Sequence, residues 1–100
     1  INKVLSYRVF PDENQKMNLS LKDIKGDILV VSQFTLAADT KSGTRAGFST
    51  AMPPNDAENL YNYFVEKIKA FNLKTECGVF GADMSVSLIN DGPVTFLLEV

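Results

Sequence analysis

The sequence contains no histidine, and its 100 residues include a single cysteine, Cys77. Without histidine the chain cannot build a Ser–His–Asp or Cys–His catalytic device or a His-ligated zinc site. A lone cysteine can form neither an internal disulfide nor a cysteine metal cluster. We therefore expect no metal and no cofactor, and any catalysis has to rely on other groups.

Long apolar runs and a strong net charge are also missing. The longest apolar runs, residues 28–31 and 96–98, are far too short to cross a membrane, and no secretory leader pattern opens the chain. The net charge is only -2, so a nucleic-acid partner would need a local basic patch. These features predict a cytoplasmic protein without a membrane partner. The first residue is Ile1, not methionine, which suits a fragment or a processed product.

What is present is typical of one globular domain over residues 1–100, with 45% apolar and 22% charged residues. Apolar periodicity predicts one long amphipathic helix from Asn55 to about Asn72, capped by Asn55 with Glu58 three residues on. Its apolar stripe is Leu60, Phe64, Ile68 and Phe71, widened by Tyr61 and Val65. Residues 1–6 suit the last turns of another helix.

Strands are predicted at residues 7–10, 17–21, 28–31, 75–80, 84–89 and 94–100. Strands outnumber helices, and a tight turn joins the last two. The expected fold class is therefore α+β, with mainly antiparallel sheets packed against the long helix. Residues 37–54 have no usable period and are expected to form a long loop, which in a small domain is often functional.

Three hydrogen-bonding side chains, Ser32, Gln33 and Thr35, directly follow the apolar strand 28–31. One interpretation, favoured by the local pattern alone, is a strand end whose side chains bond neighbouring backbone. The other is a cluster of donors around a reacting carbonyl. Because no histidine can activate Ser32 or Thr35, oxyanion stabilisation by side chains and backbone N–H groups is the more economical catalytic role.

The stretch Asn90-Asp91-Gly92-Pro93-Val94-Thr95 reads locally as a hairpin turn. A Gly–Pro bond there could also be cis, which would aim two backbone carbonyls the same way and form a rigid surface that sorts ligands by shape.

Two further stretches have both a structural and a functional interpretation. Around Phe80, Gly78 and Gly81 would let backbone approach a ligand, and Phe80 and Met84 could cradle a base; the alternative is a core Phe and Met beside a turn. In the long loop, Lys41 and Arg45 are either solvated charges or phosphate contacts.

Ser32-Gln33-Phe34-Thr35 and, some sixty residues later, Asn90-Asp91-Gly92-Pro93-Val94-Thr95 match in order the two signature motifs of one family. On these motifs, on the intervening Phe80–Met84 and on the helix with Leu60-Tyr61, the chain resembles the D-aminoacyl-tRNA deacylase (D-tyrosyl-tRNA(Tyr) deacylase) family over all its residues. The resemblance implies a deacylase-like β/β/α sandwich and a homodimer with its active sites at the interface. It also implies that an N-terminal hairpin and most of a first helix are absent here.

The resemblance further implies hydrolysis of D-aminoacyl-tRNA, and of glycyl-tRNA mischarged on tRNA(Ala), with L-aminoacyl-tRNA rejected. Gly92 and Pro93, joined by a cis bond, would enter the partner's pocket and exclude an L side chain. The catalytic pocket would be lined by Ser32, Gln33, Phe34 (through its backbone) and Thr35, with the substrate's own 2′-OH assisting. The terminal adenosine would be held by Phe80, Gly81, Ala82, Met84 and Asn90.

One departure concerns the long loop, where Arg45-Ala46-Gly47-Phe48 stands in place of the family's Arg-Pro-Ser-Phe and predicts a looser segment. The expected partner is the aminoacylated 3′ end of tRNA, contacted at phosphates by Lys41 and Arg45, and no DNA. Two alternatives stay open. One is a non-catalytic nucleic-acid-binding module on the same fold, and the other is a related deacylase with a trans Gly–Pro bond.

Overall fold

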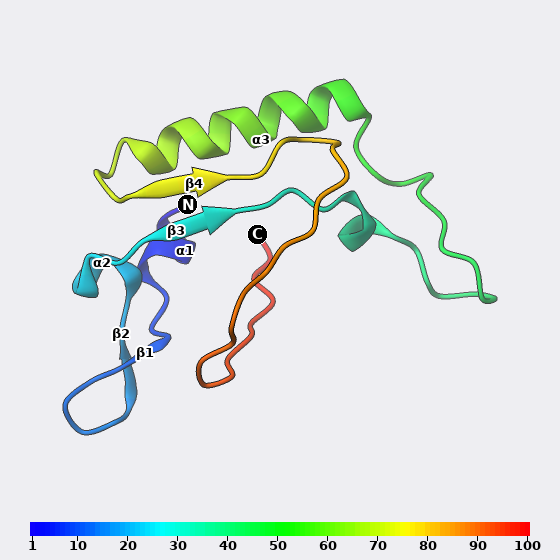
Figure 1. The fold of residues 1–100 in the computed structure, drawn as a ribbon. Coiled ribbons are helices and arrows are strands. Elements are labelled where there is room, and N and C mark those ends of the chain that lie inside the picture. The colour runs from blue at the N-terminus through cyan, green and yellow to red at the C-terminus, as the bar shows by residue number, and fades with distance from the viewer.

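The structure, a computed structural model, describes residues 1–100 and has an α+β architecture, as predicted (Figure 1). In chain order its elements are α1 (Asn2–Ser6), β1 (Phe10–Pro11), β2 (Met17–Leu19), α2 (Leu21–Ile24), β3 (Ile28–Val30), the 3-10 helix η1 (Phe34–Ala37), α3 (Pro54–Lys69) and β4 (Thr75–Cys77). None of the helices is long and apolar enough to cross a membrane.

Helix α3 begins at Pro54, one residue before the predicted Asn55. Its N-cap is Pro53, which makes no side-chain capping bond, so the predicted capping box of Asn55 and Glu58 does not form. Proline suits the first helical position because its φ is already helical and its missing N–H would have had no partner there. The helix ends before the predicted Asn72, which has a positive φ of 59° and lies in the following turn.

Helix α3 lies alongside β4 in Figure 1. Its buried residues are Val65 and Ile68, and they supply the apolar contact that holds the helix in place. Leu60, predicted to belong to the apolar stripe, is 55% exposed, and Phe71 is exposed in the turn after the helix. The buried face is therefore narrower than the sequence period indicates.

The strands form two separate pairs, one antiparallel and one parallel. Strands β1 and β2 pair antiparallel, whereas β3 and β4 pair parallel with Val30 opposite Cys77. The prediction of mainly antiparallel sheets is therefore not confirmed. The parallel pair is possible because the long loop and α3 connect its strands, and such a crossover brings the chain back to the same edge.

The strands predicted at residues 84–89 and 94–100 are wrong. Both segments run as extended chain on either side of a bend at residues 91–92 (Figure 1). No backbone–backbone hydrogen bond involves any residue beyond Ala82. The alternating pattern predicts a face to bury, but a strand also needs a neighbour to complete its ladder. Here Ile89 and Leu97 are 94% and 80% exposed.

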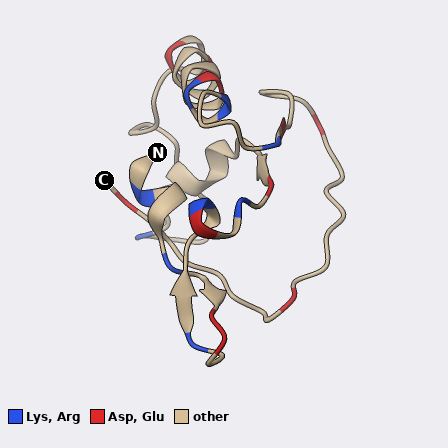
Figure 2. Cartoon of the chain, turned by 90° about the vertical axis from the view of Figure 1, so that its left-hand side faces the viewer, with Lys and Arg blue, Asp and Glu red and all other residues tan.

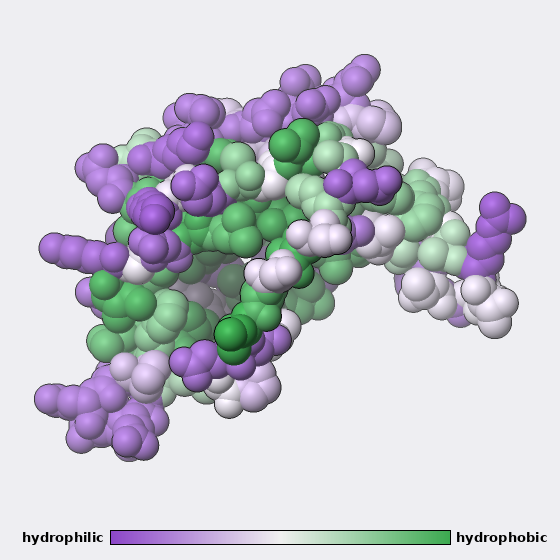
Figure 3. Space-filling model, in the orientation of Figure 1, coloured by the Kyte–Doolittle hydropathy of each residue, from purple (hydrophilic) through white to green (hydrophobic).

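Few residues are buried, and many large apolar side chains are exposed. Figure 3 shows apolar side chains gathered around a hollow in the face crossed by the C-terminal segment. A groove of about 440 Å³ lies between the α1–β1 region and residues 94–98. Across the same region the rings of Tyr7 and Phe96 lie 5.5 Å apart.

A capping box that sequence analysis missed starts α2. Ser20 Oγ accepts a hydrogen bond from the Asp23 backbone N–H at 3.2 Å, and Asp23 Oδ2 accepts one from the Ser20 N–H at 2.8 Å. Two hydrogen bonds to the carboxylate lower the pKa of Asp23. The larger effect comes from the Ser20 backbone N–H and the smaller one from the Ser20 hydroxyl. The signal in the sequence was a serine followed three residues later by an acid, but Asp replaces the usual Glu or Gln.

We expect Ser20→Ala to lower the free energy of unfolding by about 1 kcal/mol, the usual loss for an N-cap, measured by urea denaturation. Ser42→Ala, at an exposed loop serine without a hydrogen bond, is the control.

Because the folded pKa of Asp23 lies below the ordinary 3.8, its stabilisation is present above that pH and lost as the pH falls through the lowered value. Asp23→Asn should therefore flatten part of the acid destabilisation, and an unchanged acid profile would contradict this.

Candidate functional site

The two stretches that follow β3 and β4 lie at the same end of the structure. Because the two strands are parallel, their carboxyl ends meet at one edge. Ser32 and Gln33 follow β3, and Gly78 and Phe80 follow β4. The structure thereby brings together two of the stretches that the sequence singled out. In open α/β sheets, ligands usually bind at the carboxyl ends of parallel strands, and the same edge is the candidate site here.

The Ser32–Thr35 stretch does not continue the strand. Strand β3 ends at Val30, and η1 begins at Phe34, preceded by Gln33 in an extended conformation. The N–H groups of Phe34 and Thr35 donate to no acceptor in the chain. The first N–H groups of a helix have no partner within it, so both are free to donate to a ligand.

The side chains of this stretch bond one another. Gln33 Nε2 donates to Thr35 Oγ1, in place of the expected bond to neighbouring backbone. No carboxylate or amine forms a hydrogen bond with the hydroxyl of Ser32 or Thr35, so neither has a base that could activate it. Phe34 is 67% exposed and its ring lies 5.1 Å from that of Phe48 in the long loop.

The loop after β4 places Phe80 beside α3, with its ring 5.8 Å from that of Tyr61. Gly81 has a φ of +75° and nothing within 4 Å of where a Cβ would lie, so its surroundings are open, as a close backbone approach requires. At Gly78 the space is filled instead, because a Cβ there would lie 3.0 Å from Met84 Sδ. The Met84 side chain therefore packs against Gly78, and this face of it is not free to contact a ligand.

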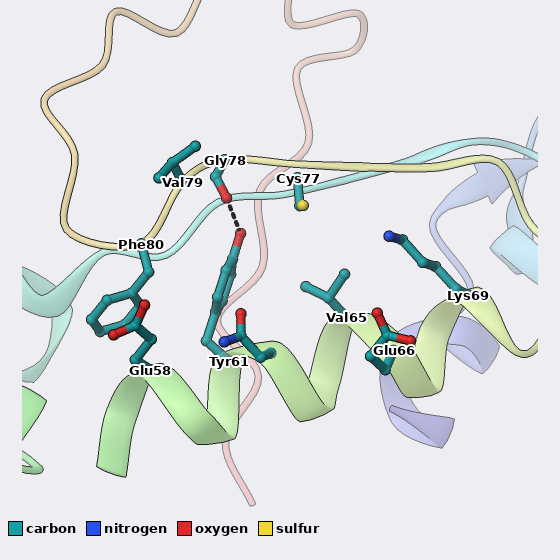
Figure 4. Close-up of a pocket in the computed structure, with 10 residues that line it drawn as sticks. Glu58, Tyr61, Val65, Glu66, Lys69, Cys77, Gly78, Val79 and Phe80 are labelled. Carbon is teal, nitrogen blue, oxygen red and sulfur yellow. Dashed lines mark hydrogen bonds between the residues drawn. The ribbon is translucent and has the colours of Figure 1, made fainter. Parts of the chain in front are cut away.

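A groove of about 330 Å³ runs between α3 and the end of β4 (Figure 4). Tyr61 rises from α3 into it, and its hydroxyl donates to the carbonyl oxygens of Gly78, at 2.6 Å, and Val30, at 3.2 Å. The pKa of Tyr61 is raised, mainly by burial and to a smaller extent by the neighbouring Cys77, so the hydroxyl keeps its proton near neutral pH. Cys77 is a free, exposed thiol that lines the same groove.

The Gly92–Pro93 bond is cis, as the resemblance led us to expect, and Gly92 has a φ of +140°. Around Gly92, the backbone nitrogen of Val94, at 3.1 Å, and its side chain, at 3.2 Å, lie nearest to where a Cβ would be. No hydrogen bond joins this turn, or Asn90 before it, to Ser32–Thr35. Within one chain the two motifs therefore form no common hydrogen-bonded site.

Lys41 and Arg45 are exposed near the tip of the long loop. Two backbone bonds between Asp39 and Gly47, of 2.7 and 3.0 Å, close this loop, and Lys41 N–H donates to the Asp39 carboxylate at 3.0 Å. Figure 2 shows basic and acidic residues intermixed along the chain rather than gathered on one basic surface. No group of three or more Cys, Asp or Glu residues is placed to hold a metal ion.

The model of the protein family described as D-Tyr-tRNA(Tyr) deacylase matches residues 1–99 of this chain. A D-aminoacyl-tRNA deacylase from Pseudoalteromonas translucida (strain TAC 125) is 63% identical, and one from Vibrio atlanticus (strain LGP32) is 61% identical; each match covers 100% of this chain and 69% of the relative. A solved structure, the c-Myc DNA Unwinding Element Binding Protein, is similar with a TM-score of 0.83 and 42% identity over 93% of this chain and 64% of that one.

The chain thus spans about two thirds of the length of these relatives. The family match extends over nearly the whole chain and includes both signature motifs. The relatives' names denote hydrolases, in agreement with the resemblance drawn from the motifs. This chain belongs to the D-Tyr-tRNA(Tyr) deacylase family.

Proposed function

We propose that this protein hydrolyses the ester of D-aminoacyl-tRNA to a free D-amino acid and tRNA, as a chiral proofreading step. The observation that carries the proposal is the free N–H pair of Phe34 and Thr35 at the carboxyl edge of β3 and β4, in a family motif without an activated nucleophile. Such donors stabilise the charge that develops on an ester carbonyl oxygen, and one of them can be worth about 10²–10³ in rate.

In this mechanism water adds to the ester carbonyl carbon while the N–H groups of Phe34 and Thr35 hold the oxyanion. The bond from that carbon to the ribose 3′-oxygen then breaks, and a water proton passes to the leaving oxygen with the adjacent 2′-OH assisting. Gln33 fixes the orientation of the Thr35 hydroxyl through their hydrogen bond. Ser32 is assigned to the lining of the catalytic pocket. No metal or cofactor takes part.

The terminal adenosine is assigned to the loop after β4. The ring of Phe80 lies against that of Tyr61, the open surroundings of Gly81 leave room for backbone contact, and Ala82 is exposed. Met84 packs against Gly78 at the start of this loop, and Asn90 supplies an exposed amide. Stacking of a base on an aromatic ring is worth about 1–3 kcal/mol.

Chiral selection is assigned to Gly92 and Pro93, acting across a homodimer. No hydrogen bond holds residues 91–93 to the rest of the chain, so the turn is free to enter a partner's pocket, where its carbonyls would exclude an L side chain and admit D-amino acids and glycine. This extends the substrates to glycyl-tRNA mischarged on tRNA(Ala). The exposed apolar side chains, including Leu97, are consistent with an interface that covers them.

The remaining assignments concern the tRNA and the assembled fold. Lys41 and Arg45 would contact tRNA phosphates from the loop tip, in the cytoplasm and without DNA as a partner. Residues 1–100 would form a single domain of a β/β/α sandwich, which the TM-score of 0.83 supports.

The direct test compares deacylation of D- and L-tyrosyl-tRNA. We expect the D-ester to be released and the L-ester to decay at the rate of buffer alone. Equal rates on both esters, or no release from either, would contradict the proposal. A non-catalytic nucleic-acid-binding module would bind tRNA with a strong salt dependence yet leave the ester lifetime unchanged.

A further inference from the structure

Tyr61 occupies the point at which the parallel β3–β4 pair comes apart. The last backbone bond of this pair runs from Gly78 N–H to the Val30 oxygen at 2.8 Å. Beyond this bond, the segment that follows β3 leads through Ser32 into η1, and the segment that follows β4 leads through Val79 to Phe80. Figure 4 shows Tyr61 reaching from α3 to Gly78, with Phe80 beside it.

A regular parallel ladder would add one more bond at this point. With Val30 opposite Cys77, the next donor would be Ser32 N–H and the next acceptor the Gly78 oxygen. This bond is absent, and Ser32 N–H donates to no backbone acceptor. The Gly78 oxygen instead accepts the Tyr61 hydroxyl at 2.6 Å, its one hydrogen bond in the structure.

We infer that Tyr61 is a positioning residue that ends the ladder and directs the Ser32–Thr35 segment away from β4. Its hydroxyl has one proton, held mainly by the nearer Gly78 oxygen and shared with Val30 at 3.2 Å. The Tyr61 hydroxyl gives the Gly78 oxygen a hydrogen bond in place of the absent one from Ser32 N–H, so the ladder can end here without leaving that oxygen unpaired. The N–H groups of Phe34 and Thr35 then stay free at the head of η1.

The same side chain holds the second part of the proposed site. The ring of Tyr61 lies 5.8 Å from that of Phe80, so one residue of α3 contacts the loop assigned to the adenosine and fixes the exit of the strand before the oxyanion donors. Misplacing such groups by about 1 Å can cost up to 10²-fold in rate. The inference rests on the proposed function, since it concerns the placement of that site.

The test is Tyr61→Phe, which keeps the ring and removes the hydroxyl. Tyr63→Phe is the matched control, because Tyr63 lies on the same helix, is 59% exposed and has a hydroxyl that makes no hydrogen bond. We expect Tyr61→Phe to lower kcat on D-tyrosyl-tRNA about tenfold with KM changed less than about twofold, and Tyr63→Phe to change neither. The backbone amide resonances of Ser32, Phe34 and Thr35 should shift in Tyr61→Phe alone.

Each outcome decides the matter. A kcat equal to that of Tyr63→Phe, with unshifted amides, overturns the inference. So does a loss of kcat that follows a fall in unfolding temperature and vanishes when the assay is cooled, because the role is then merely structural. If the unaltered chain has no deacylase activity, the proposed function fails, and the amide resonances still decide whether Tyr61 positions the segment.

Discussion

A D-tyrosyl-tRNA that carries hydrogen in place of the 2′-hydroxyl of its terminal adenosine, with the amino acid on the 3′-oxygen, is expected to be hydrolysed at least about 100-fold more slowly than the ordinary substrate. The chain has no histidine, and neither Ser32 nor Thr35 has a base within hydrogen-bonding reach. The substrate hydroxyl is therefore the group beside the carbonyl that can orient water and pass a proton to the leaving oxygen. Single-turnover rates on the two substrates measure the effect.

Thr35→Ala provides the contrast. If the backbone N–H groups carry the stabilisation, removing this hydroxyl costs the Gln33 bond and some orientation, and the rate falls only about tenfold. The deoxy substrate should thus be the more damaging change of the two. Complete loss of activity in a folded Thr35→Ala chain, with a normal rate on the deoxy substrate, would identify Thr35 as the nucleophile and overturn the mechanism.

Gly92→Ala should also lower the deacylation rate by about 100-fold. A φ of +140° is essentially confined to glycine, and the new Cβ would lie 3.1 Å from the backbone nitrogen of Val94. The turn has no backbone hydrogen bond to resist a change of shape, so the carbonyls of Gly92 and Pro93 would be re-aimed. The measurement is the rate on D- and L-tyrosyl-tRNA, with circular dichroism to follow folding.

Gly43→Ala is the control for Gly92→Ala. Gly43 also has a positive φ, +66°, but nothing lies within 4 Å of its Cβ position. We expect it to behave nearly as the unaltered chain, because the left-handed conformation alone costs an alanine only about 1–2 kcal/mol. If both variants keep full activity and full preference for the D-ester, Gly92 does not select chirality.

Local features of the sequence predicted several elements well. The 3.6-residue period predicted a helix from Asn55 to about Asn72, close to α3, and β-branched residues predicted β3, because both signals arise from neighbours along the chain. The start of α3 was displaced by one residue because Pro54, rather than Asn55, takes the first helical position. Residues 94–100 alternate like a strand yet form none, because a ladder depends on a partner that the pattern does not specify.

Residue types were enough to identify the functional stretches. They did not predict the local conformation of these stretches or the residues that contact them. The Ser32–Thr35 motif was singled out as a strand end, but the 3-10 turn that frees its N–H groups was missed. Tyr61 was assigned no role for its hydroxyl, although that hydroxyl donates to the oxygens of Val30, at the end of β3, and Gly78, directly after β4. A tyrosine on an apolar face carries a polar group that needs a partner when buried, and this was the available signal.

The sequence by itself determined which chemistry is open to this protein: the lack of histidine excludes a conventional triad, and the two motifs assign the family. The tertiary structure alone decided that β3 and β4 are parallel. Antiparallel strands would have placed Ser32 and Phe80 at opposite ends, whereas parallel strands end at the same edge. That difference depends on how α3 carries the chain back across the sheet, and Tyr61, from the same helix, fixes where the two strands part.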